Sequence, residues 1–114
     1  MSKKTPTAIL VISILFLIVG ILGFLGHAAA VRDQGQIHYD HLWICLVQLL
    51  AVVGAVYMFR GHNWARYLVL GWMGFHVVIS LHHPVSELVV HSVMFVALAY
   101  FLFSASARAY FRGA

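Results

Sequence analysis

The feature that most constrains this chain is a long run without a charged residue, residues 8–30. A helix needs about 20 predominantly apolar residues to cross the hydrocarbon core of a bilayer, and this run is long enough. The whole chain is 63% hydrophobic and 9% charged, whereas an average soluble domain has about 25% charged residues. Lipid is therefore the expected main solvent, and the 114 residues are expected to form a single transmembrane domain, residues 1–114.

Polar connections divide the chain into four apolar segments. We expect transmembrane helices over residues 8–30, 42–59, 64–81 and 85–107. Gly61 suits a helix end and Asn63 a helix start, while Pro84 disfavours helix in the residue before it. In lipid, only helices or closed barrels satisfy the backbone, and these segments lack the alternating polarity of barrel strands. The sequence therefore predicts an all-α fold, an integral membrane four-helix bundle of two antiparallel helical hairpins.

The basic residues predict the orientation of this bundle. Cytoplasmic loops of membrane proteins carry an excess of lysine and arginine. One side of the predicted bundle carries Arg32, and the other side carries Lys3, Lys4, Arg60, Arg66, Arg108 and Arg112. We therefore expect both termini in the cytoplasm. Because these residues form no continuous basic face, nucleic-acid binding is not expected.

The first segment also allows an alternative interpretation. Lys3 and Lys4, the apolar run and the alanines at 28–30 together imitate a cleavable secretory signal, and cleavage would leave three spans. The apolar run is longer than the core of a signal peptide, which has about 7–15 residues. This length favours a retained membrane anchor.

Residues 60–66 (RGHNWAR) form the predicted inner turn. Arg60 and Arg66 flank Trp64, and tryptophan is typical of the interface between membrane and water. We expect these three side chains to contact lipid headgroups. A cytoplasmic partner that binds the same turn is the alternative.

Histidines gather on the predicted outer side, and this segregation is the most informative feature of the sequence. Only His62 lies at the inner side, and the outer side carries seven histidines and all three acids: His27, His38, His41, His76, His82, His83, His91, Asp33, Asp40 and Glu87. Antiparallel helices that join at His83 and Pro84 place His76 and His91 at equal depth, about 10 Å below the turn.

Helical spacing predicts two polar stripes. His76, Ser80 and His83 lie at i, i+4 and i+7 on the third segment, and Glu87 and His91 lie four apart on the fourth. Ionisable residues inside a membrane usually face a bundle interior or a wet cavity. We therefore expect the two stripes to face each other or the first segment.

Three interpretations of these stripes stay open. As a cofactor site, His76 and His91 can ligate haem axially, and a larger set can bind zinc or copper: His27, His76, His83, Glu87 and His91. Alternatively, the side chains hydrogen-bond across helices and hold the hairpin together, at about 0.6 kcal/mol per bond. The third interpretation is proton transfer or contact with a quinone, where a histidine beside Glu87 is useful. The single cysteine, Cys45, leaves no Cys-based metal site within one chain.

A pattern of small, aromatic and polar residues begins at the inner turn: residues 60–66, Gly71, Trp72, Phe75, His76 and Ser80. This pattern resembles small uncharacterised four-span proteins of bacterial inner membranes. The size and layout are also similar to those of DoxX-like proteins and small multidrug transporters. The transporters depend on a membrane-embedded glutamate in their first segment, and this chain has none there. The resemblance implies a bacterial inner-membrane location and names no activity.

Motifs of common enzymes are missing from the sequence. It contains no nucleophile elbow, phosphate loop, dinucleotide fingerprint or His-Glu-x-x-His motif. The leading hypothesis is therefore a non-enzymatic structural or accessory subunit of a membrane assembly, in contact with the bilayer and with further copies or a larger complex. A haem- or metal-binding redox protein is the alternative, and a small proton-coupled transporter is the third hypothesis.

Overall fold

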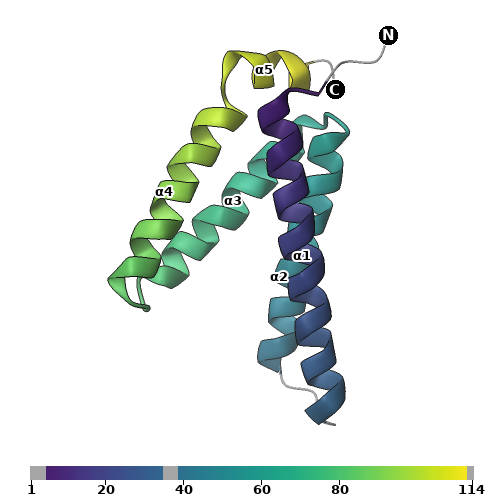
Figure 1. Ribbon diagram of the computed structural model, residues 1–114, viewed down its shortest axis with the longest axis vertical. Helices are drawn as coiled ribbons and strands as arrows, with labels where there is room; N and C mark the ends of the chain where they lie inside the picture. Colours follow the sequence, from purple (N-terminus) through teal and green to yellow (C-terminus); the bar gives the residue numbers. More distant parts are fainter. Residues whose placement is uncertain (1–4, 35–38, 113–114) are drawn as a thin grey trace.

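The computed structural model describes residues 5–34 and 39–112, and within these ranges the chain forms five α-helices and no strand (Figure 1). They are α1 (Thr7–Gln34), α2 (Tyr39–Phe59), α3 (Asn63–Ser80), α4 (Val85–Leu102) and α5 (Ala105–Arg112). The prediction of an all-α fold is confirmed. Seven side chains on which the sequence-based predictions rest lie outside the side chains that the structure describes: Lys3, Lys4, Asp33, His38, Asp40, His41 and Arg112.

Three of the described helices are long and apolar enough to cross a membrane, which indicates a membrane protein. Their apolar spans are Thr7–Ala30 in α1, Leu42–Phe59 in α2 and Val85–Leu102 in α4. The helix α3 has the same length as α4, 18 residues. It is less apolar because it contains Asn63, Arg66 and His76.

The four long helices form two antiparallel pairs, α1 with α2 and α3 with α4 (Figure 1). Two glycines let α1 approach α2 closely. A Cβ atom on Gly20 would lie 2.6 Å from Val52 Cγ2, and one on Gly23 would lie 2.6 Å from Gln48 Cδ. Small residues permit such close packing of helices in membranes. Gly26 has no such neighbour within 4 Å, so it does not contribute to this contact.

The turn between α2 and α3 depends on Gly61, whose φ of +85° is a conformation that other residues rarely adopt. This confirms the predicted helix end. The residue that caps the start of α3 is His62, one position before the predicted Asn63, and its side chain makes no capping hydrogen bond. The second turn places Pro84 directly before α4, as the sequence predicts.

The last apolar segment is shorter than predicted. We expected a helix over residues 85–107, whereas α4 ends at Leu102 and α5 starts at Ala105. Ser104 explains the break, because its Oγ donates a hydrogen bond to Phe101 O (2.9 Å) and accepts one from the Ala107 amide (3.4 Å). Serine side chains compete in this way with the backbone bonds of a continuing helix.

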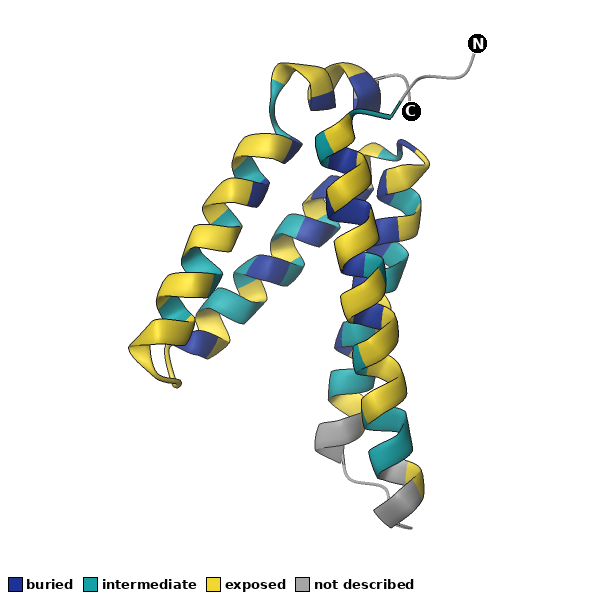
Figure 2. Ribbon diagram, viewed as in Figure 1, coloured by how far each residue is buried: buried dark blue, intermediate teal, exposed yellow. Residues whose placement is uncertain are grey.

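Buried residues gather at the end of the molecule where α5 lies across the helix pairs (Figure 2). The largest side chains that are less than 2% exposed include Ile9, Met58, Leu102 and Phe111, one from each of α1, α2, α4 and α5. In addition, the Tyr110 hydroxyl donates a hydrogen bond to Phe59 O. Away from this end, the α3–α4 hairpin diverges from the α1–α2 pair (Figure 1). The hydrophobic core therefore sits mainly at one end.

Candidate functional site

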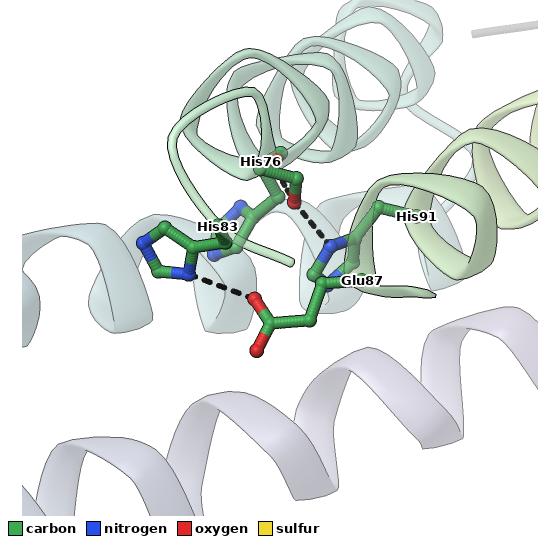
Figure 3. Close-up of polar contacts among 5 residues, drawn as sticks. His76, His83, Glu87 and His91 are labelled. Carbon is green, nitrogen blue, oxygen red and sulfur yellow. Dashed lines mark hydrogen bonds and ion pairs between the residues drawn. The ribbon is translucent and has the colours of Figure 1, made fainter. Parts of the chain in front are cut away.

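Ser80, at the end of α3, links the two helices of the second hairpin. Its side chain is 1% exposed, and its Oγ donates a hydrogen bond to His76 O at 2.7 Å. His91 Nδ1 on α4 lies 2.6 Å from the same Oγ (Figure 3). A hydroxyl has only one hydrogen to donate, and Ser80 directs it to the carbonyl. His91 Nδ1 therefore carries the hydrogen of this second bond and donates it to Ser80.

His76 is held in the same tautomer by a different partner. Its Nδ1 lies 2.9 Å from Trp72 O, and because a carbonyl oxygen only accepts, Nδ1 must donate. The imidazole also lies against the Trp72 ring, with 3.9 Å between the ring centroids. Trp72 is fixed in turn, since its Nε1 donates to Val47 O on α2 at 2.7 Å. The backbone and a neighbouring ring thus fix the orientation of His76.

The two imidazoles lie close together, as their equal depth predicts. Their ring centroids are 6.1 Å apart. Because Nδ1 donates in both rings, each Nε2 has a free lone pair when its ring is neutral. Within the described part of the chain, no hydrogen bond to either Nε2 is found. His76 and His91 therefore present two hydrogen-bond acceptors, which are also potential metal ligands.

His83 and Glu87 form a separate pair. His83 Nδ1 lies 2.7 Å from Glu87 Oε2, and both side chains are 48% exposed (Figure 3). The sequence predicts that Glu87 shares a stripe with His91, four residues on. In the structure the Glu87 carboxylate bonds to His83. This exposed pair is expected to contribute at most about 1 kcal/mol to stability.

The five-residue metal set predicted from the sequence is not assembled. No group of three or more His, Cys, Asp or Glu side chains that could hold a metal ion is found among the described residues. His27 lies on α1 and does not line the cavity that His76 and His91 share. His27 is separated from His76 and His91 because α3 and α4 diverge from the part of α1 that carries His27 (Figure 1).

A cleft of about 480 Å³ lies between α1 and the α3–α4 hairpin. His76, His91 and Gln48 are its polar lining residues, and the others are apolar: Ile12, Leu15, Phe16, Val19, Trp72, Met73, Met94, Ala97, Leu98 and Phe101. The buried Gln48 Oε1 has no hydrogen-bond partner among the described residues. Sequence reasoning missed this cleft, because no local pattern signals where two hairpins diverge.

The three residues predicted to contact lipid at the inner turn separate in the structure. Trp64 is 48% exposed, and Arg60 is exposed beside the Tyr57 ring, 5.8 Å from its centroid. Arg66 is only 9% exposed, and its Nη1 donates to Leu102 O at 3.2 Å. Its guanidinium carbon also lies 4.6 Å from the centroid of the Phe103 ring. Arg66 therefore joins α3 to the end of α4 instead of facing lipid.

No protein-family model matches the chain, and no curated protein or solved structure was found to be similar to it. The possible chemistry of the site is therefore inferred from the side chains of His76 and His91. Two oriented imidazoles with free Nε2 lone pairs can accept hydrogen bonds or ligate a metal at the edge of an apolar cleft. The described residues around them provide no carboxylate or cysteine in a metal-binding group.

Proposed function

We propose that this chain is a small multi-pass protein of the bacterial inner membrane that acts as a non-enzymatic accessory subunit of a membrane assembly. The observation that supports this most is the exposure of α4. Only 11% of the apolar span Val85–Leu102 is buried, compared with 28% for each of the spans in α1 and α2. The helix α4 therefore has an apolar surface that the other described residues leave uncovered.

One stripe of α4 is suited to packing against another helix. Val89, Val93, Val96 and Tyr100 follow one another at helical spacing, and each is between 54% and 72% exposed. Valine has one strongly preferred side-chain rotamer in a helix, so packing it costs little side-chain entropy. Helices in membranes associate by van der Waals packing of this kind. The occupant that we propose for this stripe is a transmembrane helix of a partner protein.

The proposed topology has four crossings with both termini in the cytoplasm. The helix α3 is less apolar than the others, but two of its polar side chains make internal hydrogen bonds, Arg66 Nη1 to Leu102 O and His76 Nδ1 to Trp72 O, while Arg66 Nε has no partner among the described residues. Such internal hydrogen bonds are what a helix needs to carry polar residues in lipid. Arg60 and Arg108 lie at the end of the molecule where α1 begins, which supports a cytoplasmic location for that end.

Photo-crosslinking tests the partner contact. A benzophenone amino acid is introduced at Val93, which is 62% exposed on α4, or at the control position Leu22, which is 65% exposed on α1. In native membranes we expect a protein adduct of one defined mass from Val93, and the same partner from Val89 and Val96. Leu22 should give lipid adducts only. Lipid adducts alone from every position, together with a monomer in mild detergent, would contradict the accessory role.

A second candidate function is haem binding, and the fixed tautomers of His76 and His91 favour it. Histidines that ligate a metal through one nitrogen usually donate the other N–H to a carbonyl, carboxylate or water. Bis-histidine ligation of haem iron needs two such ligands, whereas a closed zinc site needs four. A pair of imidazoles thus fits haem better than zinc.

Visible absorption and metal analysis of the purified protein test this second candidate. A stoichiometric haem spectrum that disappears in the His76→Ala, His91→Ala double variant would support it. His83→Ala is the matched control, because this histidine belongs to the exposed pair with Glu87. A folded wild-type protein without haem or bound metal would exclude the cofactor function.

A further inference from the structure

The cleft between α1 and α4 has two chemically different parts. Apolar side chains from both helices line most of it, among them Ile12, Phe16 and Met94. His76 and His91 line it as well, and their unpaired Nε2 atoms are hydrogen-bond acceptors. Its volume of about 480 Å³ falls in the range of small-molecule sites, about 300–1,000 Å³. An occupant that matches both parts must be apolar along its body and polar at one end.

The hydrogen-bond pattern selects the polar end of the occupant. A neutral imidazole whose Nδ1 donates can only accept at Nε2, and the Nδ1 contacts of His76 and His91 give both rings this pattern in their neutral form. The complementary group is therefore a donor, such as a hydroxyl. An ester or ketone oxygen offers no hydrogen to Nε2. Both imidazoles are half-buried beside apolar side chains, and a hydroxyl that reaches Nε2 there makes a hydrogen bond that an ether or ester oxygen cannot make.

We propose that this cleft binds an amphipathic alcohol or phenol, whose hydroxyl donates a hydrogen bond to His76 or His91 and whose apolar body lies between α1 and α4. Met94 suits such a site, because methionine adapts its shape to irregular apolar partners. The site goes beyond the accessory role, since the cleft-lining residues Ala97 and Leu98 do not belong to the valine stripe of α4. It uses the same imidazoles as the haem candidate, as acceptors instead of metal ligands.

A matched pair of probes tests the proposal. The first is a long-chain primary alcohol with a photoreactive diazirine in its chain, and the second is the corresponding methyl ether, which differs only in lacking the hydroxyl hydrogen. Both are titrated against the full-length wild-type protein in detergent micelles, after treatment with a metal chelator. The labelled residues are located by mass spectrometry. We expect the alcohol to label the cleft at about tenfold lower concentration than the ether, equivalent to about 1.4 kcal/mol.

Variants identify the source of this preference. His76→Phe and His91→Phe keep an aromatic ring but remove the acceptor, and at least one of them should abolish the difference between alcohol and ether. Ala97→Phe fills the cleft, leaves both imidazoles in place and should reduce labelling by both probes. His83→Ala is the control for loss of a histidine outside the cleft, and it should label like the wild type.

The outcomes separate this inference from the other two proposals. Equal labelling by alcohol and ether would overturn it and show that the cleft takes acyl chains by apolarity alone. Labelling outside the cleft would also overturn it. Cross-links from Val93 test the accessory role independently, because Val93 does not line the cleft. Haem in the purified protein that blocks labelling until it is removed would assign the two imidazoles to the metal instead.

Discussion

His91 on α4 donates a hydrogen bond through Nδ1 to Ser80 on α3, across a distance of 2.6 Å. Ser80 passes its own hydrogen to His76 O. This chain of two bonds fixes the tautomer of His91 and ties the two helices together close to their turn. It is an interhelical hydrogen bond of the kind that the sequence predicted for this hairpin, and it leaves Nε2 as the nitrogen of His91 without a hydrogen-bond partner among the described residues.

Replacing Ser80 tests this relationship directly. Ser80→Ala removes the acceptor of His91 Nδ1, and we expect the hairpin to lose about 1 kcal/mol of stability, as for other interhelical hydrogen bonds in membranes. Unfolding in a mixed-micelle denaturant titration measures this loss. Nitrogen chemical shifts of the imidazole should also show His91 shifting from one tautomer to a mixture. Ser86→Ala is the control, because Ser86 is exposed. An unchanged His91 tautomer in Ser80→Ala would contradict the bond.

The glycines of α1 give a second prediction. Gly20→Ala places a Cβ atom 2.6 Å from Val52 Cγ2 and 2.9 Å from the backbone oxygen of Gln48. The backbone oxygen cannot move as freely as a side chain, so the helices must separate. We expect a loss of about 1–3 kcal/mol, as for other overpacked sites.

Gly26→Ala is the matched control for this prediction, because no atom lies within 4 Å of its added Cβ. Alanine forms helix better than glycine, so stability should be equal or higher by up to about 1 kcal/mol. The same denaturant titration compares the two variants. Equal losses at Gly20 and Gly26 would show that α1 and α2 do not pack as described.

Local patterns predicted much of the fold. Gly61 and Pro84 marked the turn between α2 and α3 and the turn between α3 and α4, because their backbone chemistry acts within a few residues. The spacing of His76 and His91 predicted their proximity, because equal depth follows from the turn and the helical rise. The break at Ser104 was missed, since a serine in an apolar run ends a helix only when its hydroxyl bonds to nearby backbone groups.

Features that depend on long-range packing could not be predicted in the same way. The divergence of the two hairpins is set by contacts far apart in the sequence, so neither the cleft nor the separation of His27 from His76 was visible. The partner of Glu87 was also ambiguous, because His83 and His91 both lie four residues away. Arg66 was assigned to the lipid interface because a basic residue beside tryptophan is typical there, and its burial depends on α5.

Cysteine labelling tests the proposed topology. In a Cys45→Ser background, a single cysteine is introduced either by His82→Cys in the turn between α3 and α4 or by Ser106→Cys in α5; both positions are exposed. A membrane-impermeant maleimide should label the first in intact cells with a permeabilised outer membrane. The second should react only after the inner membrane is opened. The reverse pattern would place the termini on the outer side.

The last prediction concerns Arg66, for which a buried contact between helices can be distinguished from a contact with lipid headgroups. Arg66→Met removes the hydrogen bond to Leu102 O and the guanidinium beside the Phe103 and Phe111 rings. A hydrogen bond from a charged group contributes about 1.5–3 kcal/mol, so we expect a loss of that size. Since these contacts help hold α5, trypsin should also cleave after Arg108 more rapidly.

Arg60→Met is the matched control for Arg66→Met. Arg60 is exposed, and its removal should change stability by less than about 0.5 kcal/mol and leave cleavage after Arg108 unchanged. If Arg66 contacted lipid headgroups, as its sequence context indicates, the two variants would behave alike in neutral detergent. Both would then weaken the association of the protein with anionic lipid. A large stability loss confined to Arg66→Met distinguishes the buried arginine from the exposed one.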